Sequence, residues 1–470
     1  MKKTYTGSTG ITLSYAVREP RKEKAALYIL LSGTECDPLP IPGEDGSIAV
    51  WCEKPLWEED VCRAVGELCH RLAEAWNADE NRLYLLGEDE GAAGIWAMLP
   101  LFPRLFAACV PVGGYGDPYK IRVMRAGRIW AFAKENGEPE SPKGGVDVDG
   151  KMMLAGARNM ILSLRGQGHQ GVRCDAWTGE NVFARTDVLS WLAEQSRVKQ
   201  LEIEYIQPGL WGFEDYFHSS AYLLEGKDRA LLIDTGMAEV DFKSAAEGCT
   251  RLPITLVVTH AHRDHDGNAW QFDEVYMHED DIEMEKKHYA ASKTPTDGQI
   301  KPEAFRPLAD GQIIDLGGGI EVKAVKVWGH TPGSLVFVCE KLGLVFSGDA
   351  IGSGEVVLLY GRQDRGCLRE VMTKYRGEVE HLLDEIRNIP DPMFFGGHKY
   401  QDSSCDHIQW ERVYSGGVDY YNPLCREVAE DMRDMCTEII EGRLQEEPRE
   451  QNDGWLFRYR RAGILYLFRK

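Results

Sequence analysis

The sequence predicts an α/β domain with a mostly parallel sheet over residues 1–197 and a mixed α/β and α+β domain of sheets with outer helices over residues 198–410. Three observations support this fold class. The 470 residues exceed one ordinary domain, strand and helix patterns alternate through the first part, and later β-branched runs end in loops rich in His and Asp. The polar stretch Ser196–Gln200 marks the boundary. Residues 411–470 are expected to form a helix and a β-hairpin that pack on the second domain.

The first domain is predicted from apolar runs that alternate with amphipathic segments. Expected strands are Leu27–Ser32, Arg82–Leu86, Phe106–Val112, Arg128–Ala133 and Val172–Ala176. Expected helices are Glu58–Trp76, Gly91–Leu99, Lys151–Leu164 and Thr186–Glu194. The first of these helices carries an apolar stripe with helical spacing, through Val61, Val65, Leu68 and Leu72. Such alternation indicates a parallel sheet covered by helices on both faces.

The second domain is predicted to open with antiparallel strands and to continue into a buried strand. The expected strands are Leu201–Ile206, Ala221–Leu224, Ala230–Ile233 and the β-branched run Ile254–Val258, and the expected helices are Glu279–Ala290 and Leu368–Ile386. In the tail, Asn422–Gly442 is typical of a helix, and Trp455–Arg460 and Ile464–Phe468 are typical of a hairpin. The aromatic side chains of the tail are expected to pack in the core. Alternatively, they form an interface or a wall of the substrate pocket.

Composition and charge narrow the classes of partner. With 43% hydrophobic and 27% charged residues, the chain is typical of a globular protein. A formal charge of −21 opposes binding to nucleic acid, which needs clustered Lys and Arg. No apolar run approaches the roughly 20 residues that cross a bilayer, and the start lacks the apolar segment of a signal peptide. We therefore expect a cytoplasmic protein with a small-molecule substrate and no membrane partner, while a homo-oligomer stays open.

The twelve cysteines are scattered through the chain, and several lie inside apolar runs, as Cys109 and Cys339 do. Buried free thiols are therefore expected instead of disulfides.

The chemistry of the chain is concentrated in the stretch Thr259–Gly267, which follows the predicted strand Ile254–Val258. It places three imidazoles and two carboxylates at a strand end, and these donors suit zinc, iron or manganese. Three later stretches each place one further candidate ligand just past an apolar strand: Gly329–Ser334, Phe346–Ala350 and Phe395–Lys399.

The order H-x-H-x-D-H followed by His, Asp and His resembles the metallo-β-lactamase superfamily, and Leu232–Gly236 is similar to its early Asp-Thr-Gly turn. The resemblance covers about residues 201–410 and implies an αβ/βα sandwich with the metals at one edge. It implies that His260, His262 and His330 bind one divalent ion, that Asp264, His265 and His398 bind a second, and that Asp349 bridges them. Zinc is expected, with iron or manganese as alternatives.

Two adjacent ions predict a hydrolase, because they lower the pKa of a bridging water and stabilise the oxyanion formed when hydroxide attacks a carbonyl or phosphoryl centre. Asp264 and Asp349 are expected to take part directly. The ligands do not specify the substrate. We expect a carboxylic ester, thioester or lactone first, a phosphodiester second, and a non-catalytic binding or regulatory role last.

Four further residues are interpreted as contacts of the metal ligands or of the substrate. The resemblance implies that Asp234 lies behind the ligands, where it orients one of them or a bound water. His218 is interpreted either as a structural residue or as a substrate contact and proton donor. Tyr222 and Tyr360 are candidates to line a substrate pocket.

The stretch Leu85–Gly94 resembles the G-x-S-x-G nucleophile elbow of α/β-hydrolases, in particular small esterases and depolymerases. Asp89 occupies the nucleophile position. No histidine follows the last predicted strand, where Trp177–Asn181 stands, and His169 precedes that strand. The resemblance therefore implies a degenerate hydrolase-like domain that has lost catalysis and now serves a structural, partner-binding or substrate-shaping role.

Overall fold

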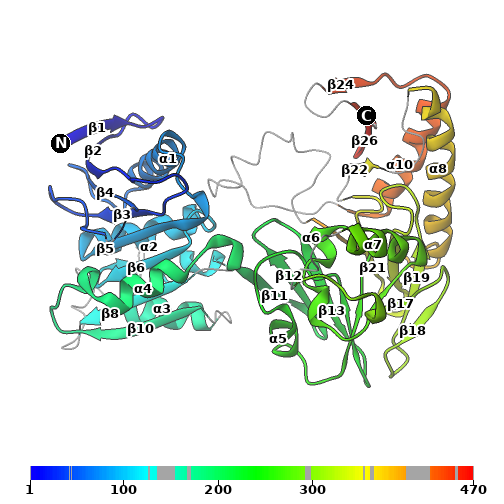
Figure 1. Ribbon diagram of the computed structural model, residues 1–470, viewed down its shortest axis with the longest axis horizontal. Coiled ribbons are helices and arrows are strands. Elements are labelled where there is room, and N and C mark those ends of the chain that lie inside the picture. The colour runs from blue at the N-terminus through cyan, green and yellow to red at the C-terminus, as the bar shows by residue number, and fades with distance from the viewer. Residues whose placement is uncertain are drawn as a thin grey trace, which may run out of the picture. The chain divides into compact units, whose positions relative to one another are not determined.

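The computed structural model (Figure 1) describes residues 2–41, 43, 45–124, 128–134, 154–166, 171–291, 298–352, 355–359, 365–398, 424–449 and 454–468. These residues fall into two compact units that meet in sequence between Gln200 and Leu201. The first unit holds residues up to 200. The second unit includes the C-terminal segment beyond residue 424 as well as residues 201–398.

The first unit is built on an eight-stranded sheet of order β1-β2-β4-β3-β5-β6-β8-β10. Its strands are β1 (Lys2–Thr6), β2 (Thr12–Arg18), β3 (Leu27–Leu31), β4 (Gly46–Trp51), β5 (Leu83–Glu88), β6 (Ala108–Val112), β8 (Ile129–Lys134) and β10 (Val172–Trp177). The pairs β1–β2 and β2–β4 are antiparallel, and every pair from β4 to β10 is parallel. The sheet is therefore α/β-hydrolase-like, with a short antiparallel edge.

Helices cover both faces of this sheet. They are α1 (Glu59–Ala75), α2 (Glu90–Leu101), α3 (Ala157–Arg165) and α4 (Thr186–Glu194). The first three share one apolar core, whereas α4 packs in a separate core on the opposite face. The predicted parallel sheet with two covered faces is confirmed. The antiparallel strands β1, β2 and β4 and the short pair β7 (Tyr115–Gly116) and β9 (Ala155–Gly156) were not predicted.

The second unit contains two sheets packed face to face. The first has the order β11-β12-β13-β14-β15-β16-β17. Its strands are β11 (Leu201–Gln207), β12 (Leu210–Asp215), β13 (Ser220–Glu225), β14 (Ala230–Ile233), β15 (Ile254–Val257), β16 (Val275–Met277) and β17 (Phe305–Pro307). It is antiparallel up to β14 and parallel from there on.

The opposing sheet has the order β18-β19-β20-β21-β23. Its strands are β18 (Ile313–Asp315), β19 (Glu321–Lys326), β20 (Leu335–Cys339), β21 (Leu344–Gly348) and β23 (Met393–Gly396). Side chains of both sheets, such as Leu231 and Phe337, meet in one buried core. The helices α5 (Phe242–Glu247), α6 (Arg263–Asp266), α7 (Glu279–Ala291) and α8 (Leu368–Glu385) complete the αβ/βα sandwich.

The C-terminal segment adds α10 (Arg426–Ile440) and the strands β24 (Glu447–Arg449), β25 (Gly454–Tyr459) and β26 (Ala462–Leu467). Helix α10 lies beside α8 (Figure 1). The predicted hairpin is confirmed as β25 and β26. Strand β22 (Glu355–Leu358), which was not predicted, pairs with β26 in parallel, so the fourth sheet has the order β22-β26-β25-β24.

Among the described residues, no helix is long and apolar enough to span a membrane. Every cysteine in the described part of the chain is a free thiol.

Candidate metal centre

The predicted ligands converge at one edge of the sandwich because each follows the end of a strand. His260, His262, Asp264 and His265 lie on the loop after β15 and on the short helix α6. Asp349 follows β21 directly, and His398 comes two residues after β23. His330 lies in the turn between β19 and β20. Parallel strands end at a common edge, so residues far apart in the sequence meet there.

The first cluster consists of His260, His262 and His330. The Nδ1 atom of His262 lies 3.1 Å from Nε2 of His260 and 2.9 Å from Nε2 of His330. Three imidazole nitrogens within 4.8 Å of one another are close enough to hold a metal ion.

The second cluster consists of Asp264, His265 and His398. The Asp264 Oδ2 atom lies 3.2 Å from Nε2 of His398 and 3.7 Å from Nε2 of His265. Nitrogen and carboxylate oxygen together form a donor set that fits zinc, iron or manganese.

Asp349 lies between the two clusters. Its Oδ2 atom lies 3.5 Å from Nε2 of His330 and 3.4 Å from Nε2 of His398, which belong to different clusters. The neighbouring Gly397 leaves the space this requires, because a Cβ atom there would come within 2.3 Å of Asp349 Oδ1 and 2.7 Å of the His265 ring. One carboxylate therefore faces both candidate ion sites.

Hydrogen bonds on the far side of the imidazoles fix their tautomers. His330 Nδ1 donates to the Val357 carbonyl over 2.8 Å, and His398 Nδ1 donates to the His218 carbonyl over 3.1 Å. His265 Nδ1 lies 2.9 Å from Asp234 Oδ2. A carboxylate has no proton to donate, so the imidazole is the donor in this hydrogen bond. In each of these rings Nε2 is therefore the nitrogen that faces the centre, where a metal ion can bind it.

Asp234 and Thr259 extend this support to His260. The Thr259 hydroxyl donates to Asp234 over 2.7 Å and so accepts from His260 Nδ1 over 3.1 Å. Asp234 also accepts from the Thr259 amide, and its backbone adopts φ 63°. A non-glycine residue in this region is uncommon, and such strain clusters at functional sites. Asp234 thus contacts groups that orient one histidine of each cluster.

Burial and neighbouring charges act differently on the two clusters. Burial, followed by the nearby imidazoles, holds the pKa of His260 well below its usual range and lowers that of His262 to about 4. Burial also lowers the pKa of His398, but Asp349 and Asp264 outweigh it and raise the value to about 10. In the absence of a cation, protons on the second cluster balance its carboxylates. A bound metal ion must displace them.

Asp281, at the start of α7, joins the two loops of the first cluster. Its carboxylate accepts from the Ala261 amide over 2.8 Å, from the Thr331 hydroxyl over 2.8 Å and from the Gly333 amide over 2.7 Å. Ala261 stands between two predicted ligands and Thr331 follows His330, so this buried carboxylate fixes the spacing between both loops. Asp281 was not predicted from the sequence as part of the site.

His218 is buried, and its position supports the structural interpretation. Its ring Nδ1 lies 3.2 Å from Glu214 Oε1, its carbonyl accepts from His398, and its backbone has φ 65°. Asp215 accepts from the amides of Ser219 and Met237, which holds the turn that presents this carbonyl. His218 therefore contacts the centre through its backbone.

Replacing His218 with alanine is expected to lower the free energy of unfolding by about 1–3 kcal/mol, because a buried side chain is lost at a strained backbone position. Activity should fall in parallel with stability. Thermal unfolding and turnover, measured on the same samples, check this. A loss of turnover of at least tenfold with unchanged stability and metal content would instead indicate substrate contact or proton delivery.

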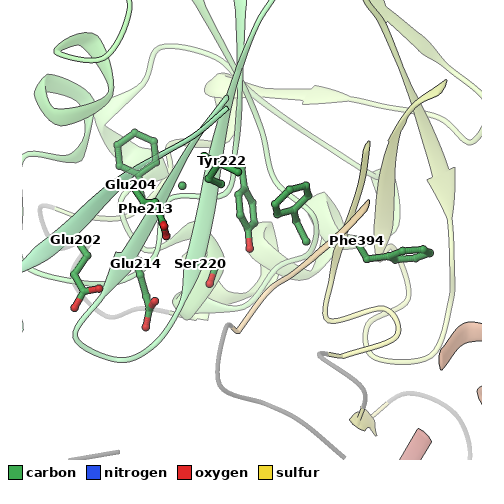
Figure 2. Close-up of a pocket in the computed structure, with 10 residues that line it drawn as sticks. Glu202, Glu204, Phe213, Glu214, Ser220, Tyr222 and Phe394 are labelled. Atoms are coloured by element: carbon green, nitrogen blue, oxygen red, sulfur yellow. The ribbon is translucent and has the colours of Figure 1, made fainter. Parts of the chain in front are cut away.

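Tyr222 lines a separate pocket of about 240 Å³ with acidic and aromatic walls. Figure 2 shows the side chains of Glu202, Glu214 and Ser220 on one side of this pocket. The Tyr222 hydroxyl donates to the Gly396 carbonyl over 2.8 Å. Its contact with substrate remains a prediction, and Tyr360 lies outside the described residues.

The hydrolase-like elbow of the first unit keeps its backbone shape. Asp89 stands between β5 and α2 with φ 46° and ψ −99°, and a Cβ at Gly91 would lie 2.0 Å from the Leu31 carbonyl oxygen. The Asp89 carboxylate is 3.1 Å from Lys134 Nζ, which itself lies 5.3 Å from the Trp177 ring centre. The predicted His169 lies outside the described residues. An ion pair occupies the position of the nucleophile.

Replacing Asp89 with asparagine is expected to leave turnover within a few-fold of the parent, because the exposed ion pair that it removes contributes little. The protein should also fail to react with a fluorophosphonate probe. Steady-state kinetics with metal analysis check this. Loss of activity at normal metal content would show a second active site.

The αβ/βα sandwich with a histidine and aspartate cluster at the edge of its strands defines a hydrolase class. Residues 215–398 match the family described as the metallo-beta-lactamase superfamily, and the chain is a hydrolase that carries a domain of this superfamily. It is 26% identical over 235 residues to the human "Acyl-coenzyme A thioesterase MBLAC2". This similarity covers 42% of the present chain and 81% of the human protein.

The chain is 28% identical over 170 residues to the "Hydroxyacylglutathione hydrolase GloC" of Haemophilus influenzae, covering 34% of this chain and 77% of that protein. The crystal structure of a thermostable esterase matches with a TM-score of 0.33 and 23% identity, over 42% of this chain and 63% of the esterase.

Proposed function

We propose that the second unit binds two divalent metal ions and hydrolyses small-molecule acyl thioesters or related carboxylic esters. The observation that carries this proposal is the position of Asp349, whose Oδ2 lies 4.0, 3.6, 3.5 and 3.4 Å from Nε2 of His260, His265, His330 and His398. His260, His262 and His330 hold one ion, Asp264, His265 and His398 hold the other, and Asp349 contacts both. Zinc is preferred, with iron or manganese as alternatives.

The bound ions supply a water of lowered pKa and an electrophile for the carbonyl oxygen. The chain's own residues hold and orient the centre. The carbonyls of Val357 and His218 fix the tautomers of His330 and His398, and Asp234 fixes that of His265. Because the hydrogen bonds are formed before substrate arrives, the site needs little reorganisation during the reaction.

The choice of thioester is supported by the printed names of two relatives, an acyl-coenzyme A thioesterase and a hydroxyacylglutathione hydrolase. Both names describe cleavage of an acyl group from sulfur. The net charge of −21 supports a small-molecule substrate over nucleic acid.

The test combines elemental analysis with a substrate panel of acyl-CoA thioesters, p-nitrophenyl esters, acyl lactones and bis-p-nitrophenyl phosphate. We expect two ions per chain and preferential turnover of thioesters, both lost on exhaustive chelation. His330→Ala should empty mainly the first site and His398→Ala the second. One ion per chain that His398→Ala leaves in place would contradict the two-ion site, and selective cleavage of the phosphodiester would contradict the substrate class.

A further inference from the structure

The C-terminal segment, residues 424–468, lies beyond the matched domain of residues 215–398 yet belongs to the same compact unit. Its strand β26 pairs in parallel with β22, and both strands lie in the buried core that α8 and α10 share. Within the described residues, β26 is the sheet partner of β22. The segment therefore determines where β22 lies.

Strand β22 carries the carbonyl that orients a predicted ligand. Val357, which stands opposite Leu465 of β26, accepts the hydrogen bond from His330 Nδ1 over 2.8 Å. The neighbouring pair Val356 and Ile464 is fully buried, so the seam between the strands is tightly packed. A displacement of β26 would move the Val357 carbonyl and release the His330 ring.

A second connection runs through α10 and α8. Tyr375 of α8 donates its hydroxyl to the Ala350 carbonyl over 2.8 Å, next to Asp349. Its ring packs so closely on the turn before His330 that a Cβ at Gly329 would lie 2.7 Å from it. Tyr375 shares one buried cluster with Met432 of α10, which packs along α8 (Figure 1).

We propose that the C-terminal segment is a positioning part of the metal centre, which holds His330 in the orientation that binds the first ion. This inference rests on the proposed two-ion site. Through the β22–β26 seam the segment acts on the first ion, because the histidines of the second cluster, His265 and His398, are oriented by Asp234 and by the His218 carbonyl. Weakening the β22–β26 seam should therefore loosen the first ion and spare the second.

Gly463→Val tests this, because Gly463 stands opposite Glu355 in β22 and an added Cβ would lie 3.1 Å from Glu355 Cγ. Gly377→Val on α8 is the control in the same unit, since nothing lies within 4 Å of a Cβ added there. Competition with a chelator measures the affinity of each ion. We expect Gly463→Val to weaken one ion about 10- to 100-fold, the range for lost outer partners of a metal ligand. Gly377→Val should retain both ions.

Gly463→Ala is the milder variant if valine prevents folding, and it should produce a smaller loss at the same ion. Equal weakening of both ions, or unchanged affinity for both, in folded Gly463 variants would overturn the proposal. An NMR measurement on the metal-free protein tests the positioning role separately from the proposed function. The Nδ1 proton of His330, assigned by its absence in His330→Ala, is expected in nitrogen-15 NMR spectra of the metal-free parent and should shift in Gly463→Val. If the parent binds no metal, the two-ion function fails, and an unshifted proton would separately refute the positioning role.

Discussion

Replacing Asp349 with alanine is expected to lower turnover by more than about 100-fold, beyond the range that loss of an outer partner of a metal ligand produces. The physical reason is its position between the clusters, with Oδ2 3.5 Å from Nε2 of His330 and 3.4 Å from Nε2 of His398. Without this carboxylate, each proposed ion would lose a ligand, and four imidazoles, those of His260, His265, His330 and His398, would lose a neighbouring negative charge. Steady-state turnover and metal content of the same preparation measure the effect.

Asp266→Asn is the matched control for this prediction. Asp266 lies on α6 beside the predicted ligand His265 and is buried, and burial together with Glu285 raises the pKa of its carboxyl well above the usual range. The amide therefore replaces a carboxyl that favours its neutral form, and activity should stay within a few-fold. Asp349→Ala with two firmly bound ions and near-parental turnover would contradict the bridging role. Loss of turnover in Asp266→Asn at normal metal content would point to a protein carboxylate as base.

Local patterns predicted most of the fold because the runs that form strands and helices are contiguous in the sequence. The predicted strand Ala230–Ile233 coincides with β14, and the predicted helix Thr186–Glu194 coincides with α4. Strand β22 was missed because Glu355–Leu358 is short, and its partner β26 comes about one hundred residues later. A local sequence pattern does not predict the pairing of two strands that lie so far apart in the chain.

The side chains of the candidate centre could be predicted from their spacing, since metal ligands follow strand ends in a recognisable order. The groups that orient them could not, because many are backbone atoms. The carbonyls of Val357 and His218 carry no identity that a sequence pattern can reveal. The prediction for His218 concerned its imidazole, whereas its main-chain carbonyl is the group that contacts His398.

Asp281 was missed for a different reason. It lies in the acidic run Glu279–Asp281 at the start of a helix, where acidic side chains ordinarily face solvent and favour the helix dipole. The fold buries this one carboxylate against the two loops of the first cluster, while Asp280 beside it forms an ion pair with Lys326 at the surface. Only the tertiary structure distinguishes the two neighbours.

Replacing Asp281 with alanine is expected to destabilise the second unit by several kcal/mol and to weaken the first ion. Three donors, the amides of Ala261 and Gly333 and the hydroxyl of Thr331, would lose their acceptor in a buried site. Each buried donor left unpaired costs about 1–3 kcal/mol. Because Ala261 and Thr331 adjoin predicted ligands, relaxation of either loop separates His330 from His260 and His262. Denaturant unfolding and chelator competition measure both effects.

Asp280→Ala supplies the comparison, since it removes the adjacent carboxylate and a surface ion pair of 2.7 Å to Lys326. Such a pair contributes at most about 1 kcal/mol, so stability and metal affinity should stay close to the parent. The argument for Asp281 requires the two variants to differ. If Asp281→Ala leaves the first ion as firmly bound as Asp280→Ala does, the two loops keep their spacing without this carboxylate, and the shape of the first cluster must come from the strands β15, β19 and β20 that carry them.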